Sequence, residues 1–343
     1  MDPRDYSYPR LVLLGLAAAL AVTVVVAAGT SSASLGAFNS AWDGTTELRT
    51  AAESSGAETT IAQNVSAYGR SGSNETIAVV LSPAEAYNDS EAAAVERFVR
   101  DGGTLLVAED YRPHGNALLE AVGAQARVTG VPLRDERNAG PSPAFPKTRP
   151  IETHPLTSGV DELMLNHGTT VEPGNATVLV ESSAYSYLDR NRNEELDDTE
   201  SLARRPVVTA ESVGEGSVVV VSDPSVFLNA MAERGDNAAF TRAVVTSHDA
   251  VLLDVSHSPA LPPLVTLRLA LEGSGVALFL AGTLSVLALF ALVGPSGLAR
   301  RLETEPSVVD EAAGEPGSPS RESTSGHVTD TLMSGDGKDH GNE

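Results

Sequence analysis

The chain has 343 residues and a formal net charge of -23, from 46 Asp and Glu against 23 Lys and Arg. This balance disfavours nucleic-acid binding, and the absence of cysteine excludes disulfides, thiolate metal sites and a cysteine nucleophile. An acidic, Lys-poor surface stays hydrated in concentrated salt, so the composition indicates a halophilic protein, with an ordinary acidic protein as the alternative.

Two apolar segments lie towards the two ends of the chain. Residues 11–29 and residues 275–294 carry no charged side chain, and each is long enough to cross a hydrocarbon core of ~30 Å. We predict two transmembrane helices. For the first, a cleaved signal peptide is the alternative, because the small residues after it could be accepted by a signal peptidase.

Arginines outside the two apolar segments predict the orientation of the chain. Arg4 and Arg10 precede the first segment, and Arg300 and Arg301 follow the second, which places both termini in the cytoplasm by the positive-inside rule. The predicted organisation is a cytoplasmic N-terminus (1–10), a transmembrane helix (11–29), a linker (30–44), an extracellular α/β domain (45–260), a juxtamembrane segment (261–274), a transmembrane helix (275–294) and a disordered acidic cytoplasmic tail (295–343).

Four glycosylation sequons agree with this orientation, since all lie in the predicted outer part. Their asparagines are Asn64, Asn74, Asn88 and Asn175.

The outer domain begins with alternating helix and strand patterns. A helix is predicted over 45–56, and the apolar runs 76–83 and 104–110 predict buried strands. Asn88 can cap the helix between these strands, with Glu91 at the third position of a capping box.

The later part of the domain predicts more strands. Besides a helix over 114–123, we expect strands at 176–181 and 249–256, a hairpin of 206–211 and 217–223, helical stretches at 225–233 and 237–247, and a long loop excursion over 130–175. Continuous apolar strands alternating with helices predict a mostly parallel, flavodoxin-like sheet with helices on both faces. The hairpin adds an antiparallel part.

Ligands of such sheets bind beyond the carboxyl ends of the strands. Those ends carry Ser82, Glu109, Asp110, Asp223 and Asp254. Glu109, Asp110 and Asp223 are the catalytic candidates, and capping of the following turn is the alternative role for the two aspartates. His257 follows Asp254 closely and forms the only His–carboxylate pair of interest, since HExxH and GxSxG motifs are absent.

One acidic stretch has the ligand spacing of a calcium loop. Its predicted oxygen ligands are Asp189, Asn191, Asn193, Asp197 and Glu200, with the Glu195 carbonyl at the seventh position. Glu194 fits poorly, because the sixth position needs the positive φ that glycine adopts most easily. We predict a structural Ca²⁺ loop, and the alternative is a solvated acidic loop without a metal.

Two segments resemble a known family. "SPAEAYNDSEAAAVERFVRDGGTLLVAEDY" and "GEGSVVVVSDPSVFLNAM" look like those of archaeal and bacterial membrane proteins described as domain of unknown function 4350. That group is similar in fold to class I glutamine amidotransferases, and the likeness covers most of residues 45–260. It implies a flavodoxin-like α/β sandwich. It does not imply amidotransferase chemistry, which needs a cysteine that this chain lacks.

Members of that family are often found together with a MoxR-type AAA ATPase. The resemblance therefore implies a role in a membrane assembly. We therefore expect a catalytically inactive outer domain that acts as a binding or scaffold subunit, with such an ATPase or transporter subunits as partners. An envelope-glycan hydrolase that uses strand-end carboxylates, or an auxiliary subunit of an ABC-type exporter, are the alternatives.

Overall fold

The computed structural model describes residues 8–29, 31–259, 261–272, 276, 279–280 and 282–284. The chain divides into two compact units, Met1–Leu278 and Phe279–Glu343, and the described fold lies in the first. The predicted tail, 295–343, lies outside the described residues.

The elements of the first half alternate between helices and strands. They are α1 (Tyr8–Gly29), α2 (Thr46–Ser54), β1 (Glu58–Ala62), α3 (Ser66–Arg70), β2 (Thr76–Leu81), α4 (Asp89–Arg100), β3 (Thr104–Ala108) and α5 (Pro113–Val122).

The second half contains mostly strands. Its short elements are β4 (Arg127–Val128), β5 (Leu133–Asp135), β6 (Lys147–Pro150), the 3-10 helix η2 (Pro155–Thr157), β7 (Leu163–Met164), β8 (Val171–Glu172), β10 (Ser186–Leu188) and the 3-10 helices η3 (Pro224–Phe227) and η4 (Asn229–Met231). The longer ones are β9 (Thr177–Glu181), β11 (Pro206–Val213), β12 (Gly216–Val221), α6 (Asn237–Thr246), β13 (Ala250–Asp254) and α7 (Pro263–Glu272).

One large sheet organises the domain. Its strand order is β1-β13-β2-β3-β12-β11-β9-β6-β7. The pairs from β1 to β12 are parallel, and those from β12 onward are antiparallel. The carboxyl ends of β13, β2, β3 and β12 therefore meet at one edge, as expected for ligand-binding α/β sheets.

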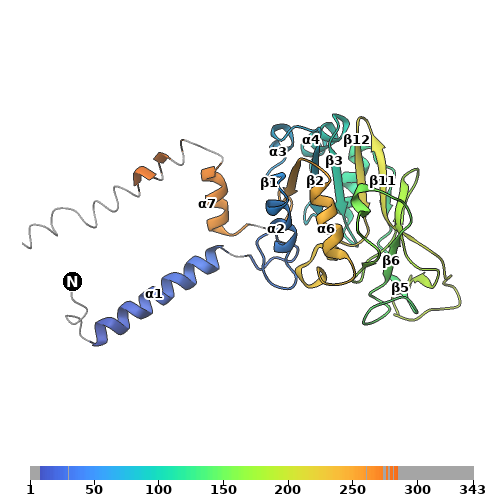
Figure 1. Ribbon diagram of the computed structural model, residues 1–343, viewed down its shortest axis with the longest axis horizontal. Helices are drawn as coiled ribbons and strands as arrows, with labels where there is room; N and C mark the ends of the chain where they lie inside the picture. The colour runs from blue at the N-terminus through green and yellow to red at the C-terminus, as the bar shows by residue number, and fades with distance from the viewer. Residues whose placement is uncertain are drawn as a thin grey trace, which may run out of the picture. The chain divides into compact units, whose positions relative to one another are not determined.

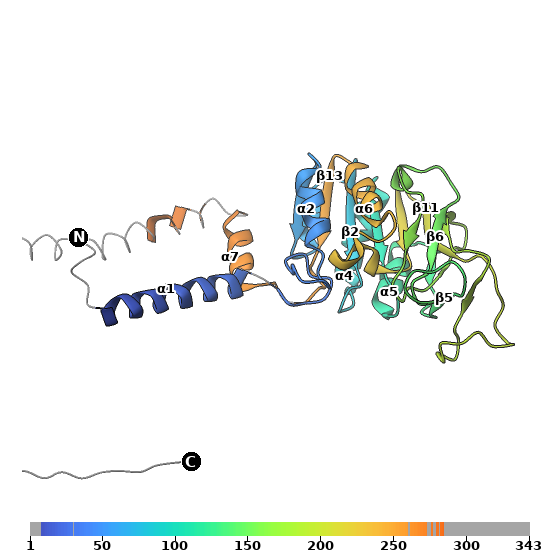
Figure 2. The ribbon, with the colours of Figure 1, turned by 60° about the horizontal axis from the view of Figure 1, so that its bottom comes forward.

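The parallel strands are buried because helices cover both faces of the sheet. Apolar side chains of α2 and α6 pack in one core cluster, and those of α3, α4 and α5 pack in the other. Figures 1 and 2 show α2 and α6 on the same side of the sheet. Val107 and Val220, in the middle of β3 and β12, have no exposed surface, which explains why these strands read as continuous apolar runs.

Most predicted elements are confirmed within a few residues. The capping box is present: the Asn88 side chain accepts from the backbone N–H of Glu91, and the Glu91 carboxylate accepts from the N–H of Asn88. The hairpin of β11 and β12 is confirmed as well.

Two expectations need correction, and two elements were not predicted. The segment 130–175 is not one loop, because β5, β6, η2, β7 and β8 form in it. The stretch 225–233 forms two short 3-10 helices, since Asp223 and Pro224 start a tight turn there. The strand β1 and the helix α3 had no matching prediction, because their short segments lack a clear apolar period.

The helix α1 covers the first apolar segment. In the described part of the chain, no helix meets the length and apolarity needed to span a bilayer. Most of the second predicted span, 275–294, lies outside the described residues. The two transmembrane helices stay predictions.

Gly216 tests the close packing at the start of β12. A Cβ atom there would lie 2.2 Å from the backbone oxygens of Gly103 and Val99. We expect Gly216→Ala to lower the free energy of unfolding by about 1–3 kcal/mol, because backbone atoms cannot move aside cheaply. Thermal unfolding of the full-length chain, followed by circular dichroism, measures this.

The matched control is Gly69→Ala in α3, where an added Cβ meets nothing within 4 Å. Alanine favours helices over glycine by up to about 1 kcal/mol, so this variant should melt at the wild-type temperature or above. Equal melting temperatures for Gly216→Ala and wild type would show that the packing is looser than described.

Candidate functional site

The structure brings the polar ends of β2 and β3 together. Ser82 follows β2 and has a φ of 38°, and its hydroxyl donates to the Glu109 carboxylate over 2.9 Å. Glu109 is fully buried and also accepts from the backbone N–H groups of Asp110, Arg112 and Gly115 over 3.0–3.3 Å. Burial is the main reason why the pKa of Glu109 is raised. This carboxylate holds the turn between β3 and α5.

Asp223 has the same role at the end of β12. It is fully buried and accepts from the backbone N–H of Asn166 at 2.6 Å and of Ser225 at 2.8 Å. Burial raises its pKa from 3.8 to about 7, although the two N–H donors act in the opposite direction. Asp223 therefore caps η3 and anchors the loop that carries Asn166, as the capping alternative predicts.

Asp110 lies beside these groups and is half-buried. Its carboxylate accepts from the backbone N–H of Tyr111 at 2.6 Å. The Tyr111 hydroxyl donates to the backbone carbonyls of His167 and Gly168, and the Arg192 guanidinium lies 5.5 Å from the centre of the Tyr111 ring. Burial raises the pKa of Tyr111 to about 12, so its hydroxyl is a neutral donor at physiological pH.

Asp254 and His257 are connected only indirectly. Asp254 accepts from the hydroxyls of Tyr68 and Tyr87 at 2.7 and 2.9 Å and from the N–H of Ser256. His257 contacts the Ser256 hydroxyl at 2.8 Å and the Glu91 carboxylate at 3.1 Å, and its ring stacks on Tyr87. Since Glu91 is also the capping-box residue, this network ties the segment after β13 to the start of α4.

The acidic loop is folded around Asp189. This side chain is fully buried and forms a 2.7 Å ion pair with Arg134. It also accepts from the N–H groups of Asn193 and Glu194 at 3.1 Å. The Arg134 pair and these donors hold the pKa of Asp189 below its usual value against burial. Glu194 has a φ of 69°, so the sixth position does adopt the conformation that a calcium loop requires.

The other predicted ligands contact one another. Asn191 and Asn193 donate their side-chain amides to Asp197 at 2.6 and 3.1 Å. Glu200 accepts from the N–H groups of Arg190 and Asp197, while Glu195 is exposed. Among the described residues, no group of three or more acidic or histidine side chains is placed to hold a metal ion.

The four sequon asparagines are all exposed. Asn64 and Asn88 accept hydrogen bonds at Oδ1 from nearby backbone N–H groups, which leaves the Nδ2 atom to which a glycan attaches free of these contacts. Asn64 lines one cavity of the domain, and Asn175 and Thr177 of the same sequon both line another.

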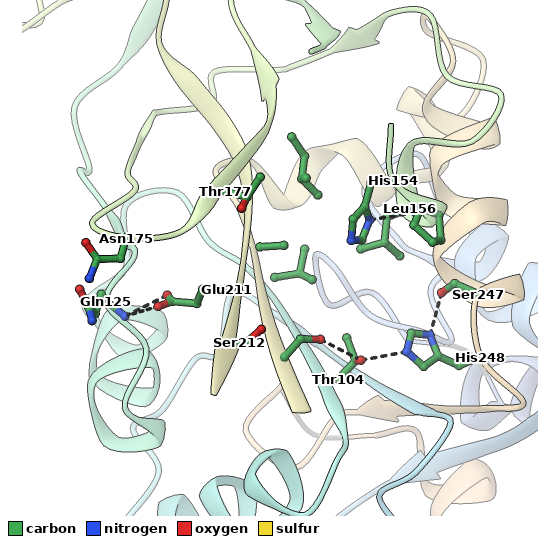
Figure 3. A pocket seen from close by; sticks show the side chains of 15 residues that line it. Thr104, Gln125, His154, Leu156, Asn175, Thr177, Glu211, Ser212, Ser247 and His248 are labelled. Atoms are coloured by element: carbon green, nitrogen blue, oxygen red, sulfur yellow. Dashed lines mark hydrogen bonds between the residues drawn. The ribbon is translucent and has the colours of Figure 1, made fainter. Parts of the chain in front are cut away.

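This cavity, the sheet-face groove, lies at the opposite end of the parallel strands from the carboxylates. It has a volume of about 770 Å³ and is lined by residues of β9, β11 and β12, by Thr104 at the start of β3, by η2 and by the residues after α6. Figure 3 shows Asn175 and Gln125 at one end of the groove and His154 and His248 at the other.

Both groove histidines are held in place by local contacts. Nε2 of His248 lies 2.8 Å from the Thr104 hydroxyl, and Nδ1 lies 2.7 Å from the Ser247 hydroxyl. Nδ1 of His154 accepts from the N–H of Leu156 at 3.3 Å. Burial lowers the pKa of each imidazole, so both are neutral at physiological pH.

The sequence prediction placed function at the carboxyl ends and missed this groove. One signal was available: Thr104 and Ser217 are polar residues in the first two positions of two apolar strands, and they pair with each other in the register of β3 and β12. Their hydroxyls lie 3.1 Å apart. The groove also needs residues of η2 and β9, whose position does not follow from apolar periodicity.

Comparison with protein families gives one match. The family described as Domain of unknown function (DUF4350) matches residues 37–245. None of the curated proteins matches the chain significantly.

Solved structures resemble the chain only distantly. The mmIFT52 N-terminal domain has 14% identity and a TM-score of 0.39, covering 50% of this chain and 78% of that domain. A cytoplasmic protein from Salmonella typhimurium LT2 has 14% identity and a TM-score of 0.36, covering 60% and 87%. A β-galactosidase from Bacillus circulans sp. alkalophilus has 15% identity and a TM-score of 0.28, covering 46% and 22%. These values are too low to bear on function.

Asp223 gives a testable pH dependence. Because its pKa is about 7 in the folded chain and near 3.8 when exposed, the folded state binds the extra proton between these values. The contribution of Asp223 to the free energy of unfolding is therefore fully present at low pH and is lost as pH rises towards 7. Asp223→Asn imitates the protonated carboxyl and removes this loss.

As pH rises from 5 to 7, we expect the free energy of unfolding of the wild type to fall relative to that of Asp223→Asn, by on the order of 1 kcal/mol per pH unit. Urea unfolding of both full-length chains across this range measures the difference. Parallel pH profiles would contradict the assignment of a raised pKa to Asp223.

Proposed function

We propose that this chain, which belongs to the family described as Domain of unknown function (DUF4350), is a membrane-anchored binding or scaffold subunit of a cell-surface assembly. One observation carries the proposal. Glu109 and Asp223, the buried carboxylates at the ends of β3 and β12, are each taken up by backbone N–H groups. Groups used in this way hold the frame together and are poorly placed to attack a substrate.

The remaining features of the proposal come from the sequence. The two apolar segments, 11–29 and 275–294, would anchor the chain, and the α/β domain would face outward with its four sequons. The domain would be a catalytically inactive relative of amidotransferases with a flavodoxin-like frame, from a halophilic archaeal source. A MoxR-type AAA ATPase or transporter subunits are the partners that fit, and an acidic chain of net charge -23 does not favour nucleic acid.

A second candidate function, glycan hydrolysis, is favoured by the pKa of Asp223. The pKa of Asp223 is about 7, which suits a general acid at neutral pH. An envelope-glycan hydrolase would use it with Asp110, whose charge contributes to raising that pKa. An auxiliary subunit of an ABC-type exporter is the remaining alternative. In that role too, the chain would bind a partner and would not catalyse a reaction.

The experiment is mild-detergent co-purification of the tagged full-length chain from native membranes in concentrated salt. The scaffold proposal expects an AAA ATPase or a transporter subunit in stoichiometric amount, retained by Asp223→Asn. A chain that purifies alone and cleaves envelope glycans, with activity lost in Asp223→Asn but folding kept, would contradict it and support the hydrolase.

We also propose a structural Ca²⁺ in the loop 189–200. Two features support it: the positive φ of Glu194, and the N–H groups of Asn193 and Glu194 on Asp189, which close the loop around its first predicted ligand. Arg134 competes with the ion, because it already neutralises Asp189. A Kd of roughly 10⁻⁴–10⁻³ M is therefore expected, the range of weak extracellular sites.

Calorimetric titration of the full-length chain with CaCl₂ tests this site. The wild type should give a saturable heat, and Glu200→Gln should abolish it by removing the charged closing ligand. Glu211→Gln is the control outside the loop and should keep the wild-type heat. Identical heats for wild type and Glu200→Gln would contradict the calcium site and support the alternative, a solvated acidic loop without a metal.

A further inference from the structure

The sheet-face groove has the size of a small-molecule site. Its volume of about 770 Å³ falls within the ≈ 300–1,000 Å³ of ligand pockets. It lies far from the buried carboxylates along the strands, since Thr104 is the first residue of β3 and Ser217 the second of β12, whereas Glu109 and Asp223 follow the ends of these strands. The groups that line it are not used by the roles described above.

Apart from Glu211, the polar side chains of the groove are neutral donors and acceptors. Hydroxyls of Thr177, Ser212 and Ser217 and the amides of Gln125 and Asn175 line it, and these groups can both donate and accept. Neither Arg nor Lys is among the described residues that line it. An anionic ligand would therefore meet no opposite charge.

The one carboxylate that lines the groove, Glu211, already accepts hydrogen bonds from the protein backbone. Both oxygens of Glu211 accept from the backbone N–H groups of Gln125 and Ala126 over 2.9–3.0 Å. A cationic ligand would have to compete with these donors. The charge pattern thus selects a ligand that is polar and uncharged.

The floor of the groove is apolar. Leu179 and Val219 lie on the sheet face with Ala210 between them in the strand order β9-β11-β12, and Leu156 of η2 forms a side. Leu179, Val219 and Leu156 are at most 2% exposed, so the partly exposed Ala210 and the hydroxyls and amides of the rim would make the contacts. Such a rim fits the ring of hydroxyls at the edge of a pyranose.

A source for such a sugar lies on the rim. Asn175 and Thr177 form a sequon, both side chains are exposed, and both line the groove. The backbone turns sharply before β9, with the N–H of Ala176 donating to the Pro173 carbonyl at 2.9 Å. This turn leaves Asn175 at the end of the groove (Figure 3).

We propose that the sheet-face groove is a binding site for a neutral saccharide. The sugar is either a glycan attached to Asn175 of the same chain or a free envelope sugar. Both sources rest on the outward-facing domain of the proposed function. Neither depends on the assembly partner, so a failed co-purification leaves the proposal intact.

Glycopeptide mass spectrometry of the full-length chain from its native membrane tests the attached source. The expected result is a glycan on Asn175, with a melting temperature that falls by several degrees in Asn175→Gln. Asn64→Gln is the control, because Asn64 is an exposed sequon asparagine outside the groove and should leave melting unchanged.

Saturation-transfer NMR on the chain made in a bacterium without N-glycosylation tests the free source. The probes are chitobiose, glucose and glucose 6-phosphate. We expect chitobiose to bind, Ser212→Phe to weaken binding at least tenfold by filling the groove, and Ser158→Phe, an exposed serine outside it, to have no effect.

Either positive result supports the proposal and identifies the source. An unmodified Asn175 together with no chitobiose signal would overturn it. Tighter binding of glucose 6-phosphate than of glucose would overturn it as well, because the groove would then be selecting an anion.

Discussion

The fold depends on how two carboxylates are buried at the edge of a parallel sheet. Removing an ionised carboxylate from water is expensive unless hydrogen bonds replace the lost solvation. Glu109 and Asp223 meet this constraint in part, with N–H groups of the turns that follow β3 and β12 and of Asn166, and the remaining cost of burial raises the pKa of both. The same hydrogen bonds fix the start of α5 and the loop through Asn166, so the order of that edge depends on them.

The hydrogen bonds at the carboxyl ends of the strands occupy side chains that could otherwise contact a ligand. The edge where an α/β sheet usually binds ligands carries groups that are already engaged, including Asp254 with its two tyrosines. The sheet-face groove, by contrast, is lined by exposed hydroxyl and amide side chains such as those of Asn175, Thr177 and Ser212. The saccharide site that we propose therefore lies at the opposite end of the strands from Glu109 and Asp223.

The sequence predicted those parts of the fold that depend on local chemistry. The Asn88 cap, the β11–β12 hairpin and the apolar strands follow from neighbouring residues and are confirmed. Strand order does not: β13, the last strand, inserts between β1 and β2, and apolar periodicity carries no signal for this. Glu109 and Asp223 were placed at strand ends correctly, but only the contacts distinguish capping from catalysis. The groove joins residues from 104 to 248, so it could not be read from any one segment.

The most direct test of the structural role of the strand-end carboxylates is the unfolding free energy of Glu109→Gln, measured at pH 8 in urea on the full-length chain. Glutamine has one acceptor oxygen in place of two and turns its amide N–H groups towards backbone donors. The account predicts a loss of about 1–3 kcal/mol. A variant as stable as wild type, or more stable, is the behaviour of a residue kept for activity at the expense of stability, and it would contradict the account.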